Sequence, residues 1–436
     1  MSQIIDFIHD TRFEDLPAEM VLEAVRCLTD TLGVSVGGSQ TDMSRIIRNH
    51  AARQFGGTGA HIWWDGRTAS PAGAALANGI TIDALDAHDG YKPAKGHVGC
   101  GVIPGLIAVM EAEGHRDAKE LLTSIVIGYE IGSRAGAALH ASVSDYHTSG
   151  AWVALSVAAL GARQLGLSRA QTREAVGIAE YHGPRSQMMR VIDAPTMVKD
   201  GSGWGAMAGV SAAYLAQDGF TGAPAITMEA PELAHYWNDL GQNWLVAQQY
   251  IKLYPVCRWA QPPAEAILAL IKKHRFTADD VAEITIETFH EGKRLNTIPN
   301  NTEEAQYSLP FAVAVALVRG TIGVEEITQN GLSDTKIRAV AKSIIITETD
   351  EFNAAFPEHR IACAIVKLKD GRVLSSGATE AKGDPEDKVS DAVLKAKFHG
   401  LTMPVIGQDK AAALEKTIQA LPNDGDINEL LGLLAG

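Results

Sequence analysis

The chain has 436 residues, of which 46% are hydrophobic and 21% charged, and its formal net charge is -14 at pH 7. This composition is typical of a chain that folds throughout, and the length exceeds that of most single cores, so two structural units are expected. The negative charge argues against nucleic acid or an anionic membrane surface as the main partner, because both attract a broad positive face.

The cysteines and the N-terminal segment exclude further classes. Four cysteines are scattered without a C-x-x-C pair, so we predict reduced thiols rather than a zinc ribbon or an iron–sulfur cluster. The N-terminal segment carries acidic side chains and no basic stretch before an apolar run, which argues against a signal peptide. The most apolar segment, 151–162, is too short to span a bilayer. We therefore predict a cytoplasmic protein without a membrane partner.

The first half of the chain is predicted to be helical. Pro17 and the apolar residues that follow at helical spacing predict a helix that ends at Gly37 and Gly38. Further helices rich in Ala and Gly are predicted over 70–80, 101–113, 118–140, 150–165, 169–181 and 203–217. Small residues let helices approach closely, so these segments indicate a compact helical domain.

The pattern changes after Pro262 and Pro263. Alternating β-branched residues predict strands over 281–289, 344–349, 361–368 and 373–375. Asp370-Gly371 lies between the last two strands and predicts a hairpin. Helices predicted over 263–274, 309–319 and 334–343 alternate with these strands, which indicates an α+β unit, and the chain returns to helix over 390–398 and 408–435.

The chemically richest segment is the loop predicted over 85–99. It holds two aspartates, two histidines and two lysines among Gly and Pro residues, including Asp86, Lys92, Lys95 and His97. Backbone turns in such a loop aim several side chains at one point, which favours an active site. A solvated surface loop is the alternative interpretation.

His147 is a second candidate, because it comes just before an apolar helix. Thr148 or Ser149 is the expected N-cap of that helix. A helix N-terminus lowers the pKa of a neighbouring imidazole and keeps it a neutral base. A capping or core histidine is the alternative interpretation.

Two further stretches supply cations. Lys199 lies beside glycines that let the backbone approach a ligand, although an exposed lysine in a turn fits equally well. Lys252, Cys257 and Arg258 surround a rigid proline. Cys257 would need a nearby base to act as a nucleophile, and the sequence places none, so we interpret it as a residue that lines the site.

Together with the segments 30–33, 219–222, 307–311 and 382–385, these stretches resemble the MmgE/PrpD family over nearly the whole chain. That family contains 2-methylcitrate dehydratase, cis-aconitate decarboxylase and iminodisuccinate epimerase. The resemblance implies a mainly α fold: a large all-helical domain formed by 1–260 and 390–436, and a smaller α+β lid domain formed by 261–389. It also implies a homodimer and no cofactor.

The resemblance further implies an active site in the cleft between the two domains. The family's active-site positions fall on these residues of the chain: Asp86, His97, His147, Lys199 and Lys252. The chain departs from the family pattern at Cys257 and Phe311, where the decarboxylase branch carries a histidine and a tyrosine, and at Gln261, where many members carry a histidine. These departures count against decarboxylation.

These residues suggest a mechanism of proton abstraction next to a carboxylate, which needs a positioned base and fixed positive charge where the anion develops. We expect His97 and His147 to form the acid/base pair. Asp86 would orient one imidazole, and Lys199 would hold the reacting carboxylate.

The remaining cations are expected to bind the rest of a small carboxylic acid. Lys252 and Arg258 would bind its second carboxylate, Cys257 would line the site, and Lys92 and Lys95 would add positive potential.

Three reactions branch from the same anion. A hydro-lyase of the 2-methylcitrate dehydratase type ranks first, an epimerase of an iminodisuccinate-like dicarboxylate second, and a cis-aconitate-type decarboxylase third. Two other classes stay open. One is a metal-dependent hydrolase with Asp86, His88, His97 and Cys100 as ligands, although no metal is our main expectation. The other is a binding protein that holds organic acids without proton exchange.

Overall fold

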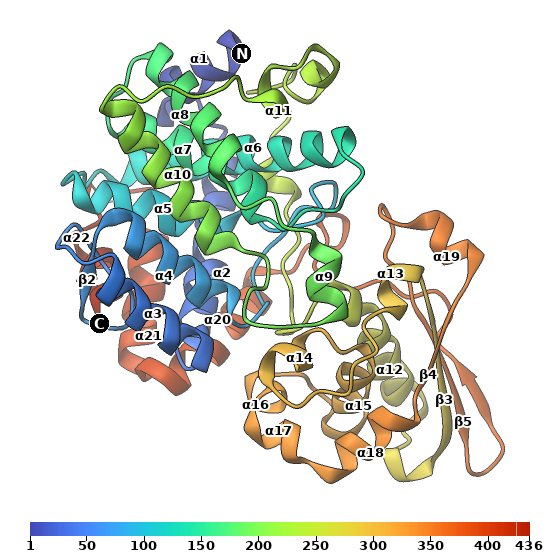
Figure 1. Ribbon diagram of the computed structural model, residues 1–436. Helices are drawn as coiled ribbons and strands as arrows, with labels where there is room; N and C mark the ends of the chain where they lie inside the picture. The colour runs from blue at the N-terminus through green and yellow to red at the C-terminus, as the bar shows by residue number, and fades with distance from the viewer. Residues whose placement is uncertain (424) are drawn as a thin grey trace.

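The protein is mainly helical. The computed structural model describes every residue except 424, with 61% of the chain in helices and 8% in strands. A larger, helical part lies beside a smaller part that combines helices with a sheet (Figure 1). The predicted fold class, mainly α with a smaller α+β unit, is confirmed.

The larger part consists of the helices before α12 and the last three helices of the chain. Its helices are α1 (Ser2–Asp10), α2 (Ala18–Gly38), α3 (Asp42–Gln54), α4 (Pro71–Asp83), α5 (Gly99–Ala112), α6 (Ala118–Ser142), α7 (Gly150–Gln164), α8 (Arg169–His182), α9 (Met188–Asp193), α10 (Ser202–Gln217), α11 (Ile226–Glu229), α20 (Asp391–Ile406), α21 (Gln408–Ala420) and α22 (Asn428–Ala435). A short antiparallel pair, β1 (Ala60–His61) and β2 (Thr68–Ala69), also belongs to it.

The smaller part runs from α12 to β6. It contains α12 (Gln261–His274), β3 (Val281–Thr288), α13 (His290–Lys293), α14 (Thr302–Gln306), α15 (Leu309–Arg319), α16 (Val324–Ile327), α17 (Gln329–Ser333), α18 (Thr335–Ser343), β4 (Ile345–Glu348), α19 (Asp350–Ala355), β5 (Cys363–Leu368) and β6 (Val373–Ser375).

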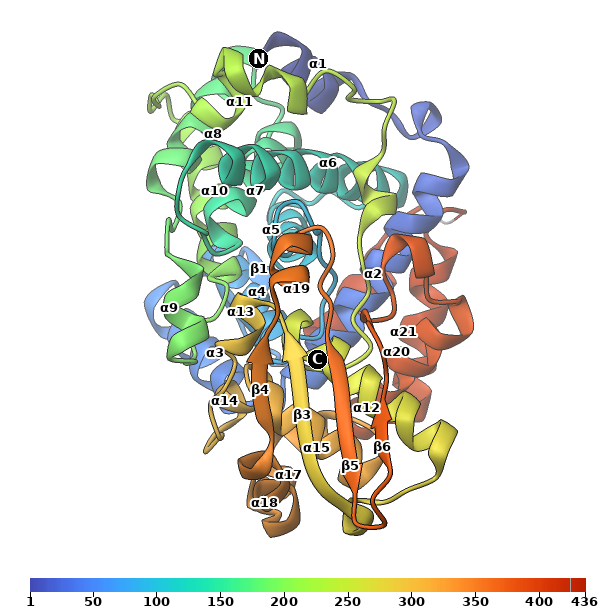
Figure 2. The same ribbon diagram turned by 90° about the vertical axis from the view of Figure 1, so that its right-hand side faces the viewer.

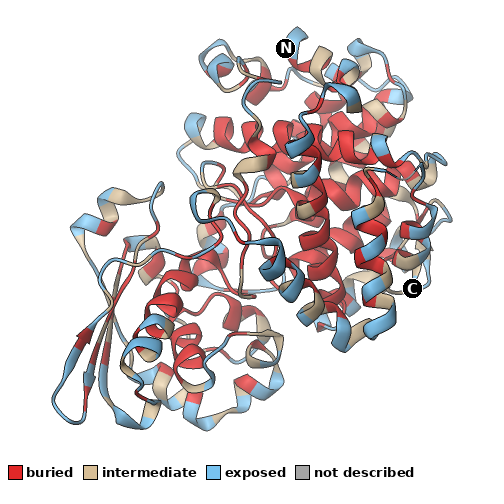
Figure 3. Ribbon diagram, turned by 180° about the vertical axis from the view of Figure 1, so that it is seen from behind, coloured by how far each residue is buried: buried red, intermediate tan, exposed pale blue. Residues whose placement is uncertain are grey.

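Small residues bring the central helices of the larger part together. α10 packs against α4 and α7. A methyl group at Gly79 on α4 would lie 2.7 Å from the Cα of Gly203 on α10, and one at Gly205 would lie 2.5 Å from the carbonyl oxygen of Gly150 on α7. These helices are largely buried in Figure 3. The close contact places the N-terminal ends of α7 and α10 side by side, where the candidate site lies.

The end of the chain returns to the larger part. α20 packs along α2, and a methyl group at Gly33 would lie 2.9 Å from the ring of Phe398. The domain boundaries predicted near 260 and 390 stay a prediction.

The four-stranded sheet of the smaller part has the order β4-β3-β5-β6. β3 pairs with β4 in parallel and with β5 antiparallel, and β5 and β6 form the predicted hairpin at Gly371, whose φ is +92°. Ile284 and Ile286 are buried, and α12 packs against β5. Figure 2 shows the open side of the sheet, with α12 and α15 behind it. Among the described helices, none is long and apolar enough to cross a membrane.

Candidate active site

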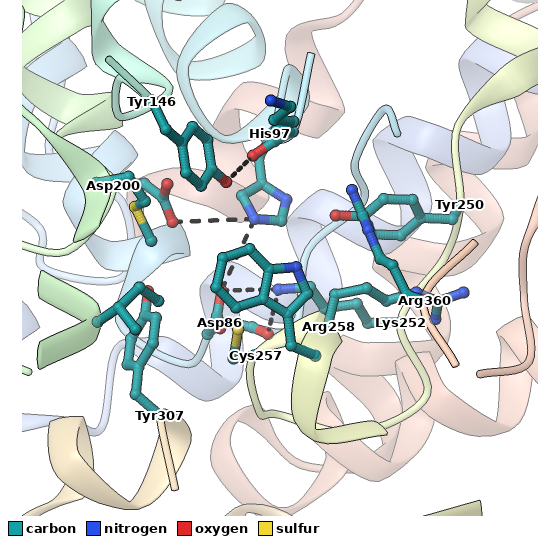
Figure 4. Close-up of a pocket in the computed structure, with 14 residues that line it drawn as sticks. Asp86, His97, Tyr146, Asp200, Tyr250, Lys252, Cys257, Arg258, Tyr307 and Arg360 are labelled. Carbon is teal, nitrogen blue, oxygen red and sulfur yellow. Dashed lines mark hydrogen bonds and ion pairs between the residues drawn. The ribbon is translucent and has the colours of Figure 1, made fainter. Parts of the chain in front are cut away.

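A small polar cavity lies where the two parts meet. The larger part supplies most of its lining, and the smaller part supplies two residues. The cavity is lined by Asp86, Lys95, His97, Tyr146, Met188, Ile192, Asp200, Tyr250, Lys252, Cys257, Arg258, Trp259, Tyr307 and Arg360 (Figure 4). Six of the predicted site residues therefore meet at one cavity: Asp86, Lys95, His97, Lys252, Cys257 and Arg258.

Three residues at or near this cavity have an unusual backbone conformation. Asp86, Lys95 and Lys199 have φ values of 50°, 50° and 44°, in the left-handed region that residues with a Cβ rarely adopt. Strain of this kind tends to collect at functional sites, where the surrounding structure holds a side chain in a required direction.

His97 presents one ring nitrogen to the cavity. Its Nδ1–H donates to the carbonyl oxygen of Asp89 at 2.5 Å, and its backbone N–H donates to Ser149 Oγ at 3.0 Å. A carbonyl only accepts, so in the neutral ring Nδ1 carries the proton and Nε2 keeps its lone pair. Burial and the positive charge of Lys252 lower the pKa of His97 well below its usual value. His97 is therefore a neutral base, with Nε2 3.9 Å from both Asp86 Oδ1 and Asp200 Oδ2.

Asp86 is held in its ionised form. Lys252 Nζ donates to its Oδ1 at 2.7 Å and to its carbonyl oxygen at 2.9 Å. Burial alone would raise the pKa of this carboxyl, but the charges of Lys252 and Lys199 hold it well below its usual range. Asp86 thus neutralises Lys252 and places a fixed negative charge beside His97.

Asp200 is the main functional candidate that the sequence analysis missed. Its Oδ1 accepts a hydrogen bond from Ser149 Oγ at 3.4 Å, whereas Oδ2 is buried without a partner among the described residues. Burial, together with the negative charges of Asp83 and Asp86, raises the pKa of Asp200 to about 7. The available signal was its place directly after Lys199 in the same glycine-rich turn.

Lys199 lies behind the cavity wall rather than in it. Its Nζ donates to the side-chain oxygen of Gln306 and lies 5.1 Å from the centre of the Tyr307 ring. Gln306 in turn donates to the carbonyl oxygen of Ala84 at 2.8 Å. Lys199 therefore acts on the site through its charge and through the residues that it holds.

The structure does not bring His147 together with His97. His147 is not among the residues that line the cavity, its backbone N–H donates to His140 Nε2 at 3.1 Å, and its ring is only partly buried. Ser149, a predicted N-cap, makes no side-chain capping bond to α7 and instead contacts His97 and Asp200. The carboxylates of Asp86 and Asp200, rather than His147, face His97 Nε2, and the predicted acid/base role of His147 stays a prediction.

Lys92 and Arg258 are engaged by the same carboxylate. Lys92 Nζ lies 2.9 Å from Asp384 Oδ2 and Arg258 Nη2 lies 2.6 Å from Asp384 Oδ1. Lys92 lines a larger neighbouring cavity, which shares Lys95 with the candidate site. The predicted binding of a second substrate carboxylate by Lys252 and Arg258 meets the difficulty that internal aspartates already neutralise both cations.

The ligand set expected for a metal-dependent hydrolase does not assemble. His88 Nε2 faces Asp83 at 3.2 Å and Cys100 Sγ donates to Ser202 Oγ at 3.1 Å, so neither points to the cavity. Potential ligand atoms of Asp86, His97 and Asp200 lie within 4.8 Å of one another. A metal ion at these residues would compete with the Lys252 ammonium for Asp86, so the donor set fits a metal poorly.

The chain is similar to known proteins whose names describe reactions of small organic acids. Models of the MmgE/PrpD N-terminal domain and the MmgE/PrpD C-terminal domain match residues 2–235 and 254–423. A cis-aconitate decarboxylase-like protein of Aspergillus oryzae is 23% identical over 100% of this chain and 97% of its own length.

Two further relatives carry names of different reactions. The cis-aconitate decarboxylase of Homo sapiens is 24% identical over 98% of this chain and 93% of its own length. A mitochondrial 2-methylcitrate dehydratase of Yarrowia lipolytica is 24% identical over 86% of this chain and 78% of its own length.

Proposed function

Because the chain belongs to the MmgE/PrpD family, we propose that it is a lyase that removes a proton next to a carboxylate of a small di- or tricarboxylate. The observation that carries the proposal is the free Nε2 of His97, which faces a small polar cavity that also contains several cations. We propose a hydro-lyase of the 2-methylcitrate dehydratase type as the specific activity.

The elimination step needs one base and one acid. His97 Nε2 takes the proton from the carbon next to the carboxylate, and the electron pair of that C–H bond forms the carbon–carbon double bond. Asp200, protonated at Oδ2, gives its proton to the departing hydroxyl group, which leaves as water. His97 and Asp200 lie 3.9 Å apart, so the proton gained by the imidazole can return to the carboxylate after product release.

The charges around this pair suit an anionic intermediate. Lys199 lies behind the cavity and donates to the neutral amide of Gln306 rather than to a carboxylate, so its charge supplies positive potential where the substrate carboxylate gains charge. This role replaces the direct carboxylate contact that we expected of Lys199. Every step uses side chains of the chain itself, so the proposal includes no cofactor.

Decarboxylation is the second candidate, and the similarity to a cis-aconitate decarboxylase and to a cis-aconitate decarboxylase-like protein along nearly the whole chain favours it. Cys257 weighs against it, because burial raises the pKa of this thiol to about 12 and makes it a poor proton donor. Epimerisation needs two proton-transfer groups on opposite faces of the substrate, whereas His97 and Asp200 lie only 3.9 Å apart. A homodimer and a cytoplasmic location stay predictions.

Product analysis separates these activities. The purified protein is incubated with 2-methylcitrate, citrate, cis-aconitate and iminodisuccinate. Alkene formation is followed by proton NMR, carbon dioxide release by a carbon dioxide assay, and inversion by chiral chromatography. The proposal predicts an alkene and water from a hydroxy acid. Carbon dioxide from cis-aconitate would favour the second candidate, and turnover of none of these acids would contradict the assignment.

A further inference from the structure

The cations at the cavity fall into two groups. Lys252 and Arg258 are each bound to an internal aspartate, at 2.7 Å from Asp86 and 2.6 Å from Asp384. Lys95 and Arg360 form no ion pair with any carboxylate of the described residues. An anion that enters the cavity therefore finds two uncompensated positive charges.

The guanidinium of Arg360 is buried, and not all of its N–H donors have a hydrogen-bond acceptor among the described residues. Its exposed fraction is 5%, and Nε has no hydrogen-bond partner in the part of the chain that the structure describes. It lies between α19 and β5, so the smaller part contributes it to the cavity. Its Cζ is 5.6 Å from the centre of the Tyr250 ring, which gives the planar group a supporting surface (Figure 4). A buried guanidinium with spare donors is costly unless a ligand satisfies it.

Lys95 and Arg360 converge although they come from different parts of the molecule. The carbonyl oxygen of Lys92 accepts the backbone N–H of Lys95 at 2.9 Å and Arg360 Nη2 at 3.4 Å. Burial chiefly lowers the pKa of Lys95; Glu291 opposes this shift, and the charge of Arg360 adds to it. Both residues thus line the same cavity, close enough for their charges to interact, and Lys95 also lines the larger neighbouring cavity.

We propose that Lys95 and Arg360 together bind the remote carboxylate of the substrate, the one that does not react. Arg360 offers two parallel N–H donors to this group and Lys95 offers a point charge. The inference rests on the proposed function and deepens it, because it names the two side chains that recognise the second carboxylate. Because one cation comes from each part, this carboxylate also ties the smaller part to the larger one.

The test measures binding of tricarballylate, a tricarboxylate without a leaving hydroxyl, by isothermal titration calorimetry. Arg360→Gln and Lys95→Gln should each weaken binding by about 10- to 100-fold, as expected for loss of a charge-assisted hydrogen bond. The double variant should lose less than the product of the two single effects, because both side chains hold one group. Arg372→Gln removes a 55% exposed arginine from the same smaller part and should leave binding unchanged.

A second ligand and a second variant guard against a simple folding defect. A monoamide of tricarballylate that lacks the remote charge should bind wild type and Arg360→Gln about equally, and Arg360→Lys should recover part of the affinity. Equal binding of tricarballylate by wild type and Arg360→Gln, in an enzyme that still turns over a hydroxy acid, would overturn the inference alone. Arg360-dependent binding without turnover of any acid would support the inference and overturn the proposed function.

Discussion

His97 and Asp200 share one site, and the protein shifts their pKa values in opposite directions. Burial and Lys252 keep the imidazole neutral, whereas burial and two neighbouring aspartates raise the pKa of Asp200 to about 7. One group is therefore ready to accept a proton at the pH at which the other still holds one. Pairs of titratable groups with diverging pKa values are a typical sign of acid/base assignment.

The rate of turnover should follow both ionisations. It should fall as the pH rises through about 7, because Asp200 loses the proton that it must donate, and fall again only at a pH well below the usual pKa of histidine, where His97 becomes protonated. Asp200→Asn should lower kcat by about 10²- to 10⁴-fold and abolish the alkaline limb. A pH profile of kcat for both proteins checks this, and an unchanged alkaline limb in the variant would assign that limb to another group.

The two candidate histidines should differ sharply. His97→Gln should lower kcat by at least about 10²-fold, because it removes the base. His147→Gln should change kcat only a few-fold, because His147 does not line the cavity. Steady-state kinetics and circular dichroism of both variants test this difference. Equal losses in two folded variants would return His147 to the reacting pair.

The sequence analysis predicted the candidate site residues of the loop over 85–99 but not all of the residues that line the cavity. Asp86 and His97 stand out because titratable residues are dense in a Gly- and Pro-rich segment. Arg360 has no such context, since it follows Glu358 and His359 in an ordinary polar stretch. Only the packing of the smaller part against the larger one brings it to the cavity, and no local pattern encodes that contact.

At the scale of single elements, α20 supports the loop that carries the site. Lys397 on α20 donates to Asp30 Oδ1 at 2.5 Å and to the carbonyl oxygen of Ala87 at 2.6 Å. Ala87 directly follows Asp86, so a helix near the end of the chain and α2 fix the start of the loop that carries the candidate site. This contact gives a structural role to the segment 30–33, which the sequence analysis used only as part of a resemblance.

Lys397→Ala should therefore destabilise the protein and disturb the site. Breaking a buried ion pair leaves Asp30 without its cation, which should lower the free energy of unfolding by about 3–5 kcal/mol. Lys395→Ala on the same helix removes a 59% exposed lysine paired with Glu415 and should cost at most about 1 kcal/mol. Urea denaturation measures both. Equal, small effects would contradict a supporting role for Lys397.

Element ends were predicted more accurately than element pairing. The predicted helix over 150–165 is α7, Gly150–Gln164, and the predicted strand over 373–375 is β6, Val373–Ser375. These limits follow from periodicity and from Gly, which act locally. The parallel pairing of β3 with β4 was not predicted, because strands separated by several helices leave no local signal of their register.

At the scale of the whole molecule, Asp384 joins the two parts. It lies in the segment that leads from β6 back to α20, and it holds Lys92, in the loop before α5, and Arg258, which begins a short 3-10 helix before α12. Both cations contact the carboxylate directly, and Arg258 is almost completely buried. This largely buried carboxylate is thus one of the polar contacts that fix the relative position of the two parts, beside the hydrogen bonds that Gln306 makes with Lys199 and Ala84.

Asp384→Asn should lower the free energy of unfolding by about 3 kcal/mol, because it leaves the buried Arg258 charge uncompensated. Glu386 lies 3.6 Å from the same Lys92 Nζ but is 77% exposed, so Glu386→Gln should cost at most about 1 kcal/mol. Thermal and urea unfolding of both variants measure the contrast. An Asp384→Asn protein as stable as wild type would contradict this role.

The central claim is that His97 removes a proton next to a substrate carboxylate, and solvent exchange tests it most directly. The purified wild-type protein and His97→Gln are incubated in deuterium oxide with the acid that is turned over, and deuterium at the carbon next to the carboxylate is followed by proton NMR. The account predicts incorporation by wild type and a loss of at least about 10²-fold in His97→Gln. Incorporation at the same rate by a folded His97→Gln protein would contradict it.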